Sequence, residues 1–269
     1  MSMIFCPLYS GSSGNALFVQ YGRTRLLIDA GKPGKTLTTA LTTIGVDPAT
    51  LSGILITHEH SDHISGAGIL SRKYHIPIYA TYDTWQAMEK KLGPVSPRLR
   101  VFFDKGMDFY LGDIGVQPFS IPHDAADPVG YRVYGGGVSI ATATDLGCFT
   151  RRVKESIAGA SLVLLESNHD LDMLQHNPHY SAHLKQRILG NRGHLSNQAC
   201  ADALMELVDT GVRNVILGHL SGENNTPALA LRTSEERAER EGVKLGVELC
   251  LDIAYRDQIG GVYTLNDGR

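Results

Sequence analysis

A dense group of potential metal ligands lies between residues 58 and 63. The segment reads His-Glu-His-Ser-Asp-His, so three imidazoles and the carboxylate of Asp62 fall within six residues. It directly follows the apolar, strand-like run Ile54–Thr57. Zinc, manganese and iron all accept imidazole and carboxylate ligands. One cation would need only three or four donors from the whole protein, so four donors in one short segment favour a centre with two cations.

Further candidate ligands follow other strand-like runs. His123 comes after "FSIP", Asp145 after "SIATAT" and His219 after "NVILG". Functional groups in α/β proteins gather at the carboxyl ends of strands, so we expect these side chains to join the first segment. Counting donors suggests one cation held by His58, His60 and His123, a second held by Asp62, His63 and His219, and Asp145 as the bridge between them.

The elements that must position these ligands form a mixed α/β pattern. Short β-type runs alternate with predicted helices in the N-terminal part. The strand-rich region from about 100 to 145 has no room for crossover helices, which disfavours a doubly wound parallel sheet. We therefore predict a four-layer αββα sandwich formed by a single domain over residues 1–269. Helices are expected over 34–45, 63–75, 82–93, 196–211 and 226–242, and late strands over 244–253 and 260–265.

Composition limits the cellular location and the binding partners that the sequence allows. Every apolar run is far shorter than the roughly 18 to 20 residues that cross a bilayer, and the N-terminus lacks the basic region of a signal peptide, so we expect a cytoplasmic protein without a membrane partner. The net charge of −3 argues against a broad electrostatic grip on nucleic acid. Lys185, Arg187 and Arg192 form the best candidate for a local basic patch, although a solvated helix face explains them as well.

Taken together, these motifs resemble the metallo-β-lactamase superfamily. The shared features occur in the family's order along nearly the whole chain: "LLIDAG" with Asp29, "THEHSDH", His123, "TDLG" and the second "GHLS". The resemblance implies the αββα sandwich, the ligand allocation suggested above, and hydrolysis by a hydroxide that bridges two divalent cations, which could be zinc, manganese or iron.

Four further stretches are similar to the WalJ (YycJ) branch of that superfamily, which comprises small metal-dependent DNA exonucleases. They are "SGSSGN" at 10–15, "HDAADPVGY" at 123–131, "ESNHD" at 166–170, and "GHLSN" at 193–197 together with "HLSGENNTP" at 219–227. This narrower resemblance implies DNA as substrate, and we expect digestion from 5′ to 3′. The sequence itself leaves polarity, strand preference, the native metal and a homo-oligomeric state open.

Three side chains are assigned catalytic roles: Asp62, Asp145 and His194. His194 precedes a predicted helix with Ser196 as its N-cap, so its imidazole could contact a phosphate or protonate a leaving oxygen. A surface or capping histidine is the alternative. Asp29 follows "LLI" and is expected to hydrogen-bond ligand histidines, unless it merely ends a strand.

Two loops supply the remaining candidates. In "SGSSGN", Ser12, Ser13 and Asn15 could form an anion-binding nest, although a hairpin loop fits equally well. In "ESNHD", Glu166 and Asn168 stand at another strand end, where they could support the site or contact the scissile phosphate.

Rival activities share the same ligands. A bound hydroxide could also cleave a small cyclic phosphodiester, a thioester or a lactone, but the sequence offers no evident apolar lid for an acyl group. A non-catalytic metal-binding module would be expected to lack a ligand, whereas all seven are present.

Overall fold

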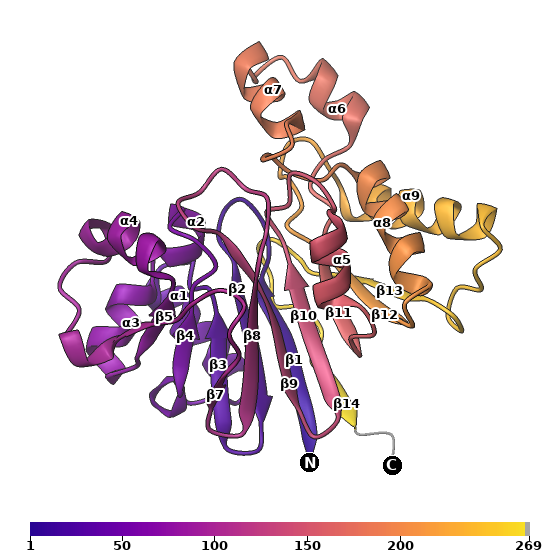
Figure 1. The fold of residues 1–269 in the computed structure, drawn as a ribbon. Helices are drawn as coiled ribbons and strands as arrows, with labels where there is room; N and C mark the ends of the chain where they lie inside the picture. The colour runs from indigo at the N-terminus through magenta and orange to yellow at the C-terminus, as the bar shows by residue number, and fades with distance from the viewer. Residues whose placement is uncertain (267–269) are drawn as a thin grey trace.

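Two β-sheets pack face to face, and helices cover both outer sides, in the computed structural model, which describes residues 1–266 (Figure 1). The first sheet holds, in spatial order, β14 (Tyr263–Asn266), β1 (Ser2–Tyr9), β2 (Ala16–Tyr21), β3 (Thr24–Ile28), β4 (Gly53–Leu55), β5 (Ile78–Ala80) and β6 (Arg100–Phe102). The second holds β13 (Cys250–Ile253), β12 (Asn214–Gly218), β11 (Leu162–Glu166), β10 (Val138–Ala143), β9 (Val129–Gly135), β8 (Ile114–Ser120) and β7 (Phe109–Leu111). This arrangement confirms the predicted αββα sandwich.

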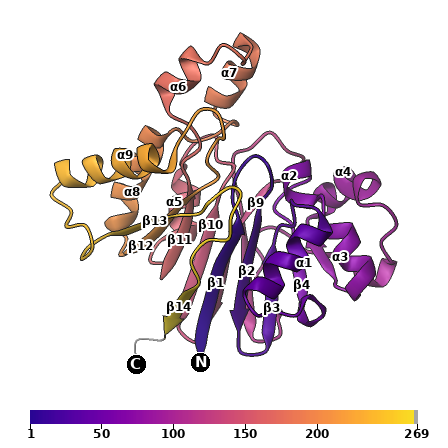
Figure 2. The same cartoon turned by 180° about the vertical axis from the view of Figure 1, so that it is seen from behind.

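Helices lie on the outside of each sheet, as Figure 2 shows from behind. The first sheet is covered by α1 (Gly34–Thr43), α3 (Ala67–Tyr74) and α4 (Tyr82–Leu92), with the short α2 (Ser61–Ile64) at its edge. The second is covered by α5 (Arg151–Ile157), α8 (Asn197–Val208) and α9 (Pro227–Arg240). The 3-10 turns Pro48–Thr50 and Pro97–Leu99 complete the connections. Within residues 1–266, no helix is both long and apolar enough to cross a membrane.

Alternation along the strands builds the layers. On β2, Leu17 and Val19 point into the core between the sheets, whereas Phe18 packs under the helices of the first sheet. Successive side chains of a strand point to opposite faces, so a strand with apolar residues on both faces must be buried on both. The continuous apolar runs noted in the sequence are therefore central strands covered on both sides.

Parallel strands bring the site residues to one edge of the sandwich. The pairs β3–β4 and β4–β5 are parallel in the first sheet, and β10–β11 and β11–β12 are parallel in the second. Their carboxyl ends consequently share an edge, which receives Asp29 after β3, His58 after β4, Asp145 after β10, Glu166 at the end of β11 and His219 after β12.

Three of these strand ends adopt a left-handed backbone. Four described residues other than glycine have positive φ, and three of them are Asp29 (62°), Asp145 (58°) and His219 (55°). This conformation costs a non-glycine residue roughly 1 kcal/mol or more, and it persists where the surroundings determine it. After the sharp turn, these side chains lie in one cluster at the edge of the sandwich, where Asp29 and Asp145 both contact His63 and His219 lies beside Asp145.

Two predicted elements differ from the structure. The expected helix over 63–75 is split into α2 and α3, because Gly66 lies against the neighbouring chain; a Cβ there would come within 2.4 Å of the Lys32 carbonyl oxygen. The expected strand over 244–253 is correct only for Cys250–Ile253. Before it the chain turns, with Gly246 at φ 76° and the Glu248 carboxylate accepting a hydrogen bond from the Lys244 amide.

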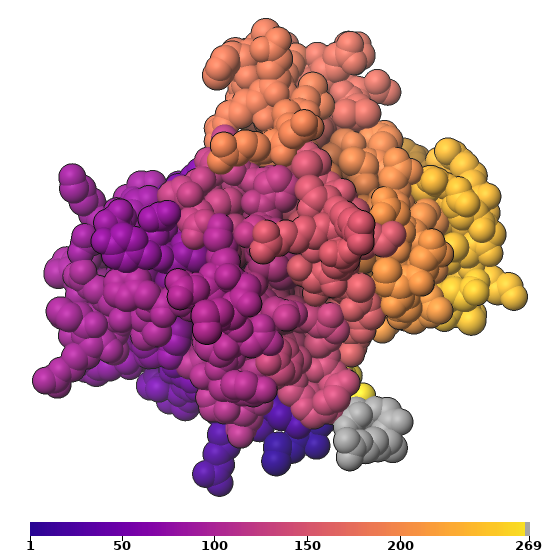
Figure 3. Space-filling model, in the orientation of Figure 1, coloured from indigo at the N-terminus to yellow at the C-terminus, as the bar shows by residue number. Residues whose placement is uncertain are grey.

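A short helical projection stands beyond the sandwich at the edge that carries the site (Figures 1 and 3). It comprises α6 (Leu171–His176), a turn, α7 (Ala182–Leu189) and the return segment to residue 192, and we call residues 171–192 the arm. The sequence did not indicate these two helices, since the polar run "HNPHYSAHLKQR" shows little apolar periodicity.

Candidate metal centre

Two groups of potential ligands lie side by side at this edge. His58, His60 and His123 offer ligand atoms that all lie within 4.8 Å of one another. Asp62, His63 and His219 form a second group that meets the same criterion. The structure therefore brings together the two sets that the sequence suggested, and each set has donors that follow strands of both sheets.

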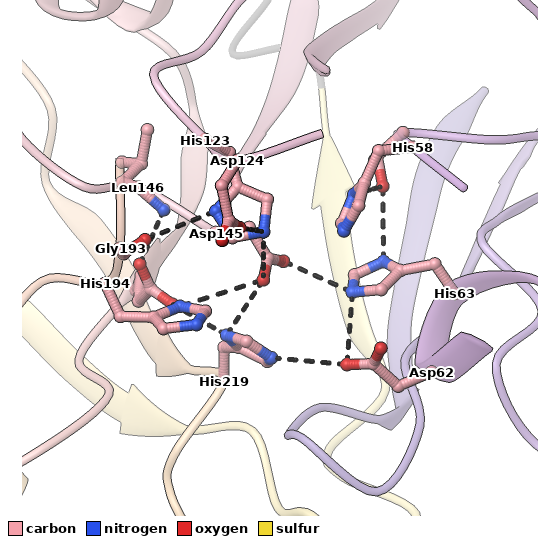
Figure 4. Close-up of polar contacts among 12 residues, drawn as sticks. His58, Asp62, His63, His123, Asp124, Asp145, Leu146, Gly193, His194 and His219 are labelled. Atoms are coloured by element: carbon pink, nitrogen blue, oxygen red, sulfur yellow. Dashed lines mark hydrogen bonds and ion pairs between the residues drawn. The ribbon is translucent and has the colours of Figure 1, made fainter. Parts of the chain in front are cut away.

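Asp145 lies between the two groups, as Figure 4 shows. Its Oδ2 is 3.3 Å from His63 Nε2, and its Oδ1 is 3.7 Å from His123 Nε2. Asp145 also forms a third possible ligand group with His58 and His63. A carboxylate so placed can reach a cation in either group, which is the geometry of a bridge.

The atoms expected to bind cations are buried without a protein partner. His58 Nε2, His123 Nε2, His219 Nε2 and Asp145 Oδ2 have no hydrogen-bond partner among the described residues. A buried polar atom left unpaired costs about 1 to 3 kcal/mol, so four of them at one place call for a ligand. Imidazole nitrogen and carboxylate oxygen suit zinc, manganese and iron, so these residues fit a divalent metal centre.

In His58 and His63 the Nδ1 atom of the ring is held by a neighbour. His63 Nδ1 lies 2.7 Å from Asp29 Oδ2, and His58 Nδ1 lies 3.0 Å from Thr57 Oγ1. Asp29 also accepts hydrogen bonds from the amide and the hydroxyl of Thr57, both at 2.9 Å. Engaging Nδ1 leaves Nε2 free to face the centre and fixes the ring orientation. Asp29 thus lies where the sequence suggested, whereas Thr57 was missed.

Glu166 holds the Nδ1 atoms of two further histidines, His219 and His194. Its Oε1 lies 2.6 Å from His219 Nδ1 and 2.9 Å from His194 Nδ1, and its Oε2 accepts hydrogen bonds from the amides of Leu146 and Leu195. Glu166 could be grouped with Asp145, His194 and His219 as a ligand. Each of its two oxygens already has two hydrogen-bond partners. We therefore interpret Glu166 as the residue that orients His194 and His219, and not as a metal ligand.

The charges of the site favour a cation. Burial lowers the pKa of His219, but the carboxylates of Asp145 and Glu166 outweigh it and raise that pKa to about 10. Burial raises the pKa of Asp62, yet the charge of His63 prevails and lowers it well below its usual range. These shifts show that the carboxylates stabilise positive charge at the site. Protons on the histidines provide that charge in the metal-free protein, and divalent cations would displace them.

His194 stands at the rim of the centre. Ser196 caps α8, its side chain accepting a hydrogen bond from the Ala199 amide, as the sequence predicted. The His194 ring lies 5.3 Å from the rings of His123 and His219, and 21% of its side chain is exposed. Burial lowers its pKa, but the Glu166 carboxylate raises it more, so the net pKa is raised. The raised pKa favours the protonated imidazole, the form that can act as an acid.

The residues of the loop at 10–15 lie partly in the site and partly on the exposed surface. Asn15 is buried, and its Nδ2 lies 3.0 Å from His63 Nε2 while its Oδ1 accepts from the Gly11 amide. Ser12 and Ser13 are exposed, and Ser13 donates to Asp257 at 3.1 Å. Of the three predicted residues, only Asn15 therefore reaches the ligands.

The "ESNHD" segment supports the site from behind. Asn168 is buried and donates from Nδ2 to the His219 carbonyl oxygen at 2.8 Å, so it holds the backbone of a ligand and does not face a substrate. Asn225, which the sequence did not single out, continues this framework by donating to the carbonyl oxygens of Ser167 and Asn168. Its only sequence signal is the polar stretch "GENNTP" beside a ligand.

Gly31 was also missed, although it decides where α2 sits. A Cβ on Gly31 would fall 1.6 Å from the Asp62 carbonyl oxygen, and the Asn15 amide donates to that same oxygen at 2.7 Å. The chain around Asp62 and His63 is thus pressed against Gly31 from one side. A glycine two residues after a predicted site aspartate was the available signal.

Fold and site together define a class of protein. An αββα sandwich gathers seven histidine and aspartate side chains at one edge, in groups that could hold divalent metal ions. The family described as "Beta-lactamase superfamily domain" matches residues 24–220, well over half of the sequence. The chain belongs to the β-lactamase superfamily, which confirms the resemblance seen in the motifs.

Individual relatives and solved structures agree with this placement. The chain is 41% identical over 243 residues to "Exodeoxyribonuclease WalJ" of Streptococcus pneumoniae strain D39, covering 90% of both proteins. It is 38% identical over 246 residues to "Exodeoxyribonuclease YycJ" of Bacillus anthracis, covering 91% and 93%. The metallo-beta-lactamase fold protein YhfI of Bacillus subtilis has a similar fold, with a TM-score of 0.74 at 16% identity over 96% and 99% of the chains. Zn(2+)-bound PqqB of Methylobacterium extorquens gives a TM-score of 0.70 at 18% identity over 96% and 99%.

Proposed function

We propose that this protein is a metal-dependent exodeoxyribonuclease that hydrolyses phosphodiester bonds of DNA with two divalent cations, progressing from 5′ to 3′. The observation that carries the proposal is the pair of possible ligand groups with Asp145 between them, in which four of the ligand atoms are buried without a hydrogen-bond partner. Two relatives that match about nine tenths of the chain bear the name exodeoxyribonuclease, which supports DNA as the substrate.

The chain's residues have distinct tasks in this reaction. His58, His60 and His123 would hold one cation, Asp62, His63 and His219 the other, and Asp145 would touch both. Two neighbouring cations lower the pKa of a water molecule between them and neutralise charge on a phosphoryl oxygen. Asp62 and Asp145 would add negative charge to the centre, which favours the binding of divalent cations.

His194 would supply the proton that the departing oxygen needs. Glu166 lies 2.9 Å from its Nδ1 and raises its pKa, which favours the protonated form of the imidazole. A proton donor of this kind typically contributes 10²- to 10⁴-fold to the rate. His194 also lies beside the amino end of α8, a position that favours a phosphate.

The remaining features of the proposal concern the metal and the setting. We propose zinc, manganese or iron, since all three accept this donor set. Both ligand groups come from one sandwich, which supports treating residues 1–269 as one domain. A DNA substrate supports a cytoplasmic location.

The test is digestion of single- and double-stranded DNA labelled at the 5′ or the 3′ end, with protein loaded with manganese, zinc or iron(II). We expect stepwise release of nucleotides from the 5′ end. Asp145→Asn should lower the rate at least about 100-fold, because the bridge contributes several kcal/mol. Asp104→Asn, in an exposed loop, is the matched control and should keep the wild-type rate.

Each outcome separates the alternatives. Release from the 3′ end would overturn the polarity alone. Absence of DNA cleavage by a fully metallated protein would overturn the nuclease proposal, and hydrolysis of cyclic phosphodiesters, thioesters or lactones would then be measured with the same variants.

A further inference from the structure

We propose that the arm binds the DNA strand that leads away from the scissile phosphate, through the face of α7 that carries His183 and Arg187. This inference rests on the proposed exonuclease function and adds a substrate-binding surface outside the metal centre. It identifies the partner as the phosphate backbone of one strand.

The arm is not held in place by the hydrophobic core. None of the eight described residues of α7 is buried, and Leu174 is the one buried residue within α6. Helices this short are not stable on their own in water. The chain thus maintains two exposed helices that contribute little burial, which points to a use for their surface.

Polar contacts tie the arm to the loop that carries a metal ligand. Arg192 donates from Nε and Nη2 to the His123 carbonyl oxygen at 3.0 and 2.9 Å. Arg187 Nε lies 2.5 Å from the Asp124 carboxylate, and Asp124 lies 3.4 Å from His123 Nε2. The base of the arm is therefore fixed directly beside the first ligand group, and α7 rises from it above the edge of the sandwich (Figures 1 and 3).

The contact with Asp124 shows which face of α7 is directed toward the site. Residues four apart lie on the same face of a helix, so His183 stands one turn further from the centre than Arg187 on that face. His183 is exposed, and 52% of the Arg187 side chain remains exposed despite its ion pair. The two side chains form a track that starts at the metal-site loop and leads outward.

The chemistry of this track suits phosphate. The arm carries three basic residues, Lys185, Arg187 and Arg192, against one acidic residue, Asp172, in a chain with a net charge of −3. Guanidinium has five N–H donors, and the bond to Asp124 uses Nε, so further donors can reach a phosphate oxygen. Contacts to phosphate supply most of the affinity of proteins for DNA without reading its sequence, as an exonuclease requires.

The test compares a 5′-phosphorylated single-stranded 20-mer with a 5′-phosphorylated dinucleotide, which is too short to follow the track. The measured quantity is the ratio of kcat/KM for the 20-mer to kcat/KM for the dinucleotide. We expect Arg187→Gln combined with His183→Ala to lower this ratio at least about tenfold and to weaken its salt dependence by about one phosphate contact. Arg232→Gln combined with Arg240→Gln removes charge from the exposed face of α9 and should leave the ratio unchanged.

Two further variants separate DNA binding from a structural role of the ion pair. Asp124→Asn removes the same ion pair but keeps the Arg187 cation, so the ratio should stay at or above the wild-type value. Arg187→Lys keeps the charge and should recover part of the ratio. A fall in the ratio with Asp124→Asn equal to that with the double variant would show that the ion pair matters only for structure and would overturn the inference.

The wild-type protein distinguishes this inference from the proposed function. If metal-loaded wild type degrades both substrates and the arm variants keep its ratio, the arm inference is wrong and the exonuclease remains. If wild type degrades neither, the exonuclease proposal fails, and the arm inference fails with it.

Discussion

At the scale of single residues, His58, His63 and His219 each use their two ring nitrogens differently. One nitrogen is held by Asp29, Thr57 or Glu166, and the other faces the space between the ligand groups. An orienting partner fixes the tautomer and ring position of a ligand histidine, so the binding geometry exists before a cation arrives. The supporting residues should therefore affect metal affinity although they touch no cation.

Asp29 offers a direct test of this view. Asn tolerates a left-handed backbone, so Asp29→Asn keeps the strand-end turn at φ 62° but weakens the hold on His63 Nδ1. We expect metal affinity to fall 10- to 100-fold, as is typical for partners of ligand histidines. Metal content after dialysis against chelator, measured by inductively coupled plasma mass spectrometry, checks this. An Asp29→Asn protein that retains metal like Asp104→Asn would contradict it.

Glu166 should control the pH range of activity through His194. The carboxylate raises the pKa of His194 and keeps it protonated, so kcat should decline as pH rises through that raised pKa. Glu166→Gln removes the negative charge, which lowers the pKa of His194 and moves the alkaline decline of kcat to lower pH. The pH profile is measured at saturating metal, because His219 also bonds to Glu166. A decline at the wild-type pH in Glu166→Gln, or in His194→Gln, would show that another group is the proton donor.

At the scale of elements, the sequence predicted the strand ends better than the segments between them. Asp29, Asp145 and His219 each follow an apolar run, and a buried parallel strand needs such a run, so local pattern was sufficient to place them. The αββα layers followed from the same pattern. What decides the split at Gly66 is a close approach to Lys32, a contact between distant segments that no local pattern records.

The residues that sequence reasoning missed share this non-local origin. Thr57 matters because Asp29 lies across from it, and Asn225 matters because it bonds the loop after β11. The helices of the arm stayed hidden because a polar, exposed helix lacks apolar periodicity. The seven ligand candidates were found because imidazole and carboxylate at strand ends are informative on their own.

Gly31 tests how closely the elements around the centre must approach. Its φ is not positive, so Gly31→Ala adds no backbone strain, but the new Cβ would meet the Asp62 carbonyl oxygen at 1.6 Å. The chain at α2 must shift, and we expect reduced metal content together with a loss of stability of about 1 to 3 kcal/mol, the usual cost of overpacking.

The control for this prediction is Gly211→Ala. Gly211 has φ 92° and open space around its Cβ position, so alanine there costs backbone strain without a collision. Urea denaturation and metal analysis compare the two variants. Equal metal content in both would mean that the approach of Gly31 to Asp62 does not set the ligand geometry.

At the scale of the whole molecule, the centre joins the two sheets. His58, His60, Asp62 and His63 follow β4 of the first sheet, whereas His123, Asp145 and His219 follow β8, β10 and β12 of the second. Each proposed cation therefore takes ligands from both sheets. The apolar core between the sheets holds them together in any case, and cations at the open edge add a second connection.

Metal removal should consequently lower the stability of the whole sandwich. A cation that binds only the folded chain stabilises it by about 2.7 kcal/mol when its free concentration is 100 times its Kd. For a chain of this size each kcal/mol shifts Tm by roughly 2 to 4 °C, so each bound manganese or zinc ion should raise Tm by roughly 5 to 10 °C above the value in chelator. Calorimetry with and without metal measures the shift. Asp145→Asn should lose most of it, because its bridge between the ligand groups is weakened, while Asp104→Asn should keep it. An unchanged Tm in wild type would mean that no cation binds tightly to the folded chain, since any tight ligand of the folded state must raise its stability.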